Sequence, residues 1–164
     1  MQGGIILKKG HLLIILIITT LIISLLFGTY TLSIQKQQKQ TANNTLMQSL
    51  SETATCFGVD YTKLDEESKI FYYMRAAANL HTAIYILPYT SFSEDKSTNQ
   101  ELINSLSGLY LSITVQSTPK SNNRWIAVTE KRQAIFECLH YISLNPKDKD
   151  KCKALEKIAK DIGY

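Results

Sequence analysis

The first part of the chain is apolar and carries no charge. No Asp, Glu, Lys or Arg lies between Lys9 and Lys36, and the run from Leu12 to Phe27 is interrupted only by hydroxyl residues. A helix rises about 1.5 Å per residue, so roughly 20 residues cross the hydrocarbon core of a bilayer. This pattern predicts a single transmembrane helix over residues 12–34.

The flanks of this run indicate an uncleaved signal anchor. The apolar run is longer than the roughly 7–15 residues of a signal-peptide core, and no small-residue cleavage site follows it. Residues 1–11 are then a short cytoplasmic tail. Lys8 and Lys9 are nearly balanced by Lys36 and Lys39 on the other side. The short tail and the large C-terminal part nevertheless favour an inside N-terminus and an outside C-terminal domain at the cell membrane.

One stretch resembles a known family. Lys8-Lys9-Gly10, followed by the apolar run up to about Phe27, resembles the start of a type IV pilin or pseudopilin precursor. That family has an aromatic residue where this chain has His11, and Glu where it has Ile15. The resemblance implies cleavage after Gly10 and packing of the apolar helix into a filament.

Beyond the anchor the pattern becomes that of a helical domain. Residues 35–44 are polar on every side, which predicts a stalk, either a polar helix that continues the anchor or a flexible tether. From residue 45 to residue 164, apolar residues recur at steps of three and four, as on one face of a helix. The first such group reaches Phe57. We therefore expect an extracytoplasmic helical domain over residues 45–164.

Polar signals mark where these helices begin and end. Thr62 to Asp65 and Thr98 to Glu101 have the form of capping boxes. Pro88 is expected to end or kink the helix after the first box. A further helix is expected over about residues 123–144. Asn145 with Pro146 is expected to stop that helix and to open the last one.

Residues 109–129 allow a second interpretation. The alternation from Leu109 to Val115 is also a strand pattern, and residues 124–129 could pair with it as a β-hairpin. The cap at Thr98 favours a helix here. The chain as a whole is predicted to be all-α, with one N-terminal transmembrane helix followed by a small bundle of four or five amphipathic helices.

Composition and charge exclude several classes of function. The 164 residues are 45% hydrophobic and 20% charged. The formal net charge is +4, of which Lys8 and Lys9 contribute two, so residues 36–164 carry only +2. This weak balance gives no reason to expect a nucleic-acid partner.

The cysteines and histidines give no catalytic motif. Cys138 and Cys152 lie equally far before and after Asn145, so a helical hairpin would bring them level. They can form a disulfide in an oxidising compartment, or remain two buried thiols of one core. Cys56 is expected to be a small core residue. No metal-ligand spacing, cofactor motif or small-molecule site is evident, and we expect neither a cofactor nor enzymatic activity.

Tyrosine is the one residue type that suggests a contact surface. The chain has nine, and we expect six of them either to line an interaction groove or to form the half-buried rim of the bundle: Tyr72, Tyr73, Tyr85, Tyr89, Tyr110 and Tyr141. The first candidates for contact are Tyr72, Tyr73 and Tyr110. The sequence thus favours a non-catalytic interaction or accessory module at the cell surface. Its expected partners are the lipid bilayer and a membrane or surface protein. The alternative is a pilin-like minor assembly subunit processed after Gly10.

Overall fold

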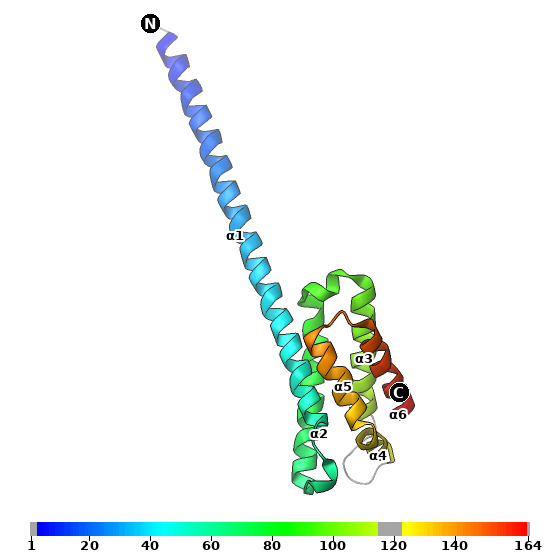
Figure 1. Ribbon diagram of the computed structural model, residues 1–164. Coiled ribbons are helices and arrows are strands. Elements are labelled where there is room, and N and C mark those ends of the chain that lie inside the picture. The colour runs from blue at the N-terminus through cyan, green and yellow to red at the C-terminus, as the bar shows by residue number, and fades with distance from the viewer. Residues whose placement is uncertain (1–2, 115–122, 164) are drawn as a thin grey trace. The chain divides into compact units, whose positions relative to one another are not determined.

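The protein is all-helical, as the sequence predicts. The computed structural model describes residues 3–114 and 123–163, and these contain no strand. Six α-helices follow one another along the chain (Figure 1): α1 (Gly3–Phe57), α2 (Glu66–Ile86), α3 (Lys96–Thr114), α4 (Asn123–Glu130), α5 (Arg132–Leu144) and α6 (Lys149–Ile162). Three short 3₁₀ helices connect them: η1 (Tyr61–Lys63), η2 (Leu87–Tyr89) and η3 (Ser91–Glu94).

The chain divides into two compact units, and α1 contributes to both. The first unit is Met1–Gln38 and the second is Lys39–Tyr164. Residues 35–44 are helical, which agrees with the polar helix rather than the flexible tether. Within the second unit, Ala42 is buried and Asn43 exchanges two hydrogen bonds of 2.9 Å with Ser91. The end of the predicted stalk is therefore part of the helical unit.

Three of the helices begin after an aspartate. The expected first residues were Thr62, Thr98 and Asn145. Asp65 accepts from the Ser68 N–H at 2.7 Å and caps α2. Asp148 does the same for α6 by accepting from the Lys151 N–H at 3.0 Å. Asn145 ends α5, as predicted, but the predicted start of the last helix at Asn145 is wrong, because Asp148 opens it. A carboxylate at a helix start accepts orphan N–H groups and is also favoured by the helix dipole.

The helix that begins at Lys96, α3, is also capped by an aspartate instead of the expected residue. The Asp95 carboxylate accepts from the Ser97 N–H at 3.1 Å and from the Thr98 hydroxyl at 2.6 Å. Thr98 itself lies inside α3 and is buried, so it is not the cap that its spacing suggested. The residue that marks the start of α3 is the aspartate three positions before Thr98.

The hairpin alternative is wrong for the residues that the structure describes. Residues 109–114 belong to α3, and residues 123–130 form α4. Residues 115–122 lie outside the described part of the chain. The expected helix over 123–144 is divided at Lys131 into α4 and α5.

The second unit has one hydrophobic core. α3 packs against α6 and α2, and α6 packs against α5. The fully buried side chains come from all of these helices and from the last part of α1; they include Leu46, Leu50, Phe57, Leu80, Leu102, Leu106, Leu109, Ile135, Leu139 and Leu155. The apolar residues that recur at steps of three and four therefore pack into one common core. Their packing determines which faces of the helices point outward.

The stability of the second unit is expected to fall in acid. The Thr98 hydroxyl and the Ser97 N–H, which donate to Asp95, hold the pKa of that carboxyl below its ordinary value of 3.8. A group whose pKa is lowered on folding stabilises the protein above its unfolded pKa, and this contribution disappears as the pH falls through the folded pKa. Asp95→Asn should therefore lower the urea midpoint at pH 7 more than at pH 3. An equal difference at both pH values would contradict this assignment.

Candidate functional site

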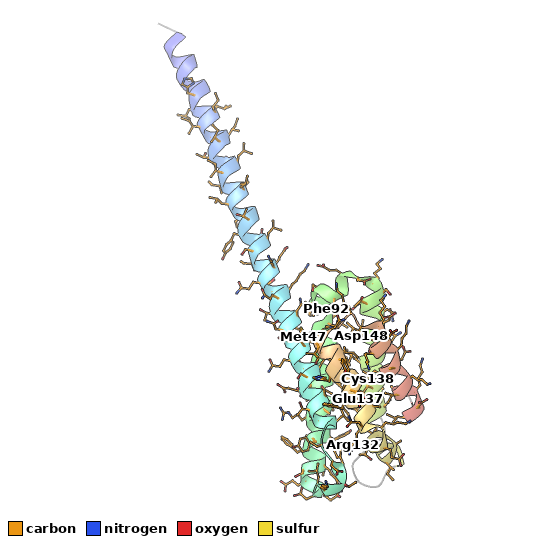
Figure 2. All side chains as sticks on the ribbon, viewed as in Figure 1. Met47, Phe92, Arg132, Glu137, Cys138 and Asp148 are labelled. Carbon is orange, nitrogen blue, oxygen red and sulfur yellow. The ribbon has the colours of Figure 1, made fainter. Side chains whose placement is uncertain are left out.

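One apolar helical segment has the length and composition to cross a membrane. Within the described residues it is the only candidate span, and it lies near the N-terminus in α1. Its large apolar side chains from Leu12 to Phe27 are 49–69% exposed. Figure 2 shows side chains projecting to both sides of this part of the helix. A long stretch of exposed leucine and isoleucine is costly in water, because it presents a large hydrophobic surface.

Four threonine hydroxyls of this segment have partners inside the helix. Thr20 donates to the Leu16 carbonyl at 2.7 Å, and Thr31 donates to the Phe27 carbonyl at 3.0 Å. Thr19 and Thr29 donate to carbonyls of the preceding turn in the same way. A hydroxyl that is bonded to its own helix costs less in lipid than a free one. These residues are therefore compatible with a bilayer span.

All three cysteines are buried in the helical unit as free thiols. Cys56 lies on α1, Cys138 on α5 and Cys152 on α6 (Figure 2 labels Cys138). Burial raises the pKa of Cys56 to about 11 and that of Cys152 to about 11, although a hydrogen bond with Ser105 acts against this shift for Cys152. Burial also raises the pKa of Cys138. The interpretation of Cys138 and Cys152 as thiols of one core agrees with this placement, and their disulfide stays a prediction.

These thiols are expected to resist modification. Alkylation needs the thiolate, and burial suppresses both thiolate formation and access. At pH 7.5 the folded, reduced chain should incorporate little iodoacetamide, and all three cysteines should react once urea is added. Peptide mapping without reductant provides the matching test of the disulfide: peptides carrying Cys138 and Cys152 would stay joined until reduced. Rapid labelling of the folded chain would contradict the burial.

Cys138 and His140 do not form a catalytic pair. Cys138 is buried, whereas His140 is exposed and stacks on Phe136 with ring centroids 5.7 Å apart. Two residues on a helix separated by two positions point in widely different directions. In the part of the chain that the structure describes, no three His, Cys, Asp or Glu residues are grouped as a metal site would need.

The predicted tyrosine surface is largely taken up by packing. Tyr72, Tyr73 and Tyr110 are half-buried and pack against the core. The ring of Tyr72 meets that of Tyr61 at 6.5 Å, and the ring of Tyr110 meets that of His81 at 5.9 Å. This placement agrees with the half-buried rim, the second of the two interpretations.

A different set of side chains forms the outward face of α2. Phe71 is 57% exposed, Met74 62% and Tyr85 68%, and Tyr89 in the adjoining η2 is 60% exposed. These four residues define the α2 stripe; the exposed Ala78 and His81 lie between them. The opposite face carries the buried Ala76, Leu80 and Ala83 of α2 and the buried Leu87 of η2. Tyr85 and Tyr89 belong to the tyrosines expected to line an interaction groove. The sequence pattern did not single out Phe71 and Met74, because α2 is apolar on two faces and only one was needed to build a core.

The lysine-rich segment before and within α6 is partly engaged inside the chain. Lys149 donates to the Ser97 hydroxyl at 2.7 Å, and the Lys151 ammonium lies 4.6 Å from the centre of the Tyr141 ring. Lys147 and Lys153 are exposed. This segment is thus a solvated surface with local partners.

The chain has no match among protein-family models, curated proteins or solved structures. Its function must therefore be argued from its own residues. Two features of the molecule suggest a function: the exposed apolar segment of α1 and the α2 stripe.

Proposed function

We propose that this protein is a membrane-anchored, non-catalytic interaction module whose helical unit acts at the cell surface. The supporting observation is the charge-free segment of α1, whose apolar side chains are exposed throughout. An anchor of this kind confines the unit near its membrane partners and raises its effective concentration there. The N-terminus lies inside the cell and the helical unit outside.

The supporting evidence for a binding rather than a catalytic role lies in the helical unit. Its thiols are buried with raised pKa values, which makes them poor nucleophiles. Four of its exposed large apolar residues, those of the α2 stripe, by contrast, gather on one helix face. Exposed apolar surface of this extent usually marks a site of contact.

The orientation can be tested with an introduced cysteine. The native cysteines are buried, so they report poorly on topology, whereas Lys153 is exposed on α6. In intact cells, a membrane-impermeant maleimide should label a Lys153→Cys chain. The matched control is Gly3→Cys in the N-terminal tail, which should be labelled only after permeabilisation. The reverse pattern would place the unit inside the cell and overturn the proposal.

The pilin-like assembly subunit remains a second candidate. A filament of packed helices would bury the apolar part of α1 as completely as a bilayer would, so the exposure of that segment supports both functions. Mass spectrometry of the protein isolated from cells separates them. A mature chain that begins at His11 would favour the assembly subunit, and an intact N-terminal tail would favour the anchored module.

A further inference from the structure

We propose that the Lys39 end of the helical unit rests on the lipid headgroups of the anchoring membrane and contacts them through Tyr89, Leu144 and neighbouring lysines. The inference rests on the proposed function, because it requires α1 to be anchored in a bilayer. It deepens that function by giving the unit a second attachment to the membrane, apart from the span itself.

The length of chain between the anchor and the unit limits how far apart they can lie. Residues 35–38 separate Ile34, the last residue of the predicted span, from Lys39, where the helical unit begins. These five steps rise about 7.5 Å in a helix, and they cover at most about 18 Å in an extended chain. The headgroup layer is about 5–7 Å deep on each side of a bilayer. Lys39 therefore lies within or close to that layer, whichever way the unit turns about the anchor.

Contacts within the unit place two connections at the Lys39 end. Lys39 pairs with Glu94 in η3, the helix that leads into α3. Lys149 at the start of α6 donates to the Ser97 hydroxyl near the start of α3 at 2.7 Å. Figure 1 shows the connection between α2 and α3 and the turn between α5 and α6 at the same end of this unit. We call residues 88–97 and 144–149 the proximal end.

Both connections of the proximal end expose a large apolar side chain beside a lysine. Tyr89 is 60% exposed in η2, and Leu144 is 64% exposed at the end of α5. Tyrosine is enriched where proteins meet headgroups, because its ring is apolar and its hydroxyl group forms hydrogen bonds. Lys96 and Lys147 are exposed on the same two connections. A lysine stem can lie along apolar surface while its ammonium group reaches a phosphate, so this combination suits a headgroup layer.

The acidic groups of the proximal end are engaged within the unit. Glu94 pairs with Lys39, whereas Asp95 and Asp148 accept N–H groups at the starts of α3 and α6. The helix dipole partly compensates a carboxylate at a helix start. Because the exposed lysines lie beside carboxylates that are compensated in this way, anionic headgroups are attracted to this end of the unit.

Fluorescence quenching by lipid tests the contact directly. Full-length Tyr89→Cys chains carry a fluorophore on the new thiol, which is labelled selectively because the native thiols are buried. They are reconstituted in phosphatidylcholine–phosphatidylglycerol vesicles that contain a phospholipid with a spin label on its headgroup. The matched control is Lys63→Cys in η1, which follows the end of α1 at Phe57, about 27 Å along the helix from Lys39.

Quenching at position 89 should exceed quenching at position 63 by at least about threefold, because the headgroup layer is thin compared with the distance between the two sites. Equal quenching at the two positions would overturn the proposal, since it would mean that the proximal end has no preference for the headgroups.

A charge-reversal variant tests the part played by the lysines. Lys96→Glu combined with Lys147→Glu should lower quenching at position 89 by at least about twofold, because the anionic surface then repels this end. The matched control is Lys63→Glu combined with Lys131→Glu, two exposed lysines at the opposite end, where α5 begins beside η1. Equal losses in the two double variants would overturn the proposal. An unchanged signal in a proximal-end variant that melts like the parent would do the same.

The remaining outcomes separate this inference from the proposed function. A chain that floats with vesicles but shows no excess quenching at position 89 overturns the headgroup contact and leaves the anchor intact. A chain that does not float with vesicles overturns both. Protection of position 89 from a water-soluble quencher that appears only at a high ratio of protein to lipid would assign the proximal end to a protein contact, and would overturn the contact with lipid.

Discussion

Replacing both Leu16 and Ile23 by arginine is expected to abolish membrane association of this chain. Both residues lie in the charge-free segment of α1 and are more than 60% exposed. Each arginine near the centre of a span costs about 2.5–3.5 kcal/mol on insertion scales, so the pair costs roughly 5–7 kcal/mol. The fraction of protein that resists carbonate extraction and floats with vesicles should fall to background.

The matched control keeps the added charge and changes only its place. Thr41 and Asn44 are exposed polar residues of α1 beyond the apolar segment. Thr41→Arg with Asn44→Arg should leave extraction and flotation unchanged. Equal loss in both double variants would show that the added charge acts through something other than insertion, and membrane retention of Leu16→Arg with Ile23→Arg would contradict the assigned span.

The second large effect is expected in the core of the helical unit. Leu106 on α3 is fully buried, and α3 packs against both α2 and α6. Leu106→Ala should lower the free energy of unfolding by about 2–5 kcal/mol, through lost apolar burial and the cavity left behind. Urea denaturation of the full-length chain in detergent, followed by circular dichroism, measures this change.

A neighbour on the same helix provides the comparison. Leu111 is 37% exposed on α3, so Leu111→Ala removes the same atoms from a site that water already reaches. We expect a loss below about 1 kcal/mol, within the range of most surface substitutions. Similar losses for both variants would mean that α3 does not occupy the centre of the unit.

Local signals accounted for much of the fold but misplaced the caps. The end of α2 at Ile86 follows from Pro88, which removes a backbone donor and clashes with the preceding turn. The residues that cap three of the helices differ from the expected Thr62, Thr98 and Asn145. They are Asp65 for α2, Asp95 for α3 and Asp148 for α6. Ser, Thr, Asn and Asp are similar as caps, so spacing alone does not choose between neighbouring candidates.

The sequence by itself determined the apolar segment, which has the length and composition of a membrane span, and the helical class. A long run without charge is costly to expose to water whatever the rest of the chain does, and apolar steps of three and four are a local property. Only the tertiary structure decided which apolar face of α2 is covered. Ala76, Leu80 and Ala83 entered the core while Phe71, Met74 and Tyr85 stayed outside, because packing against α3 accommodates one face of a helix and leaves the other to solvent or a partner.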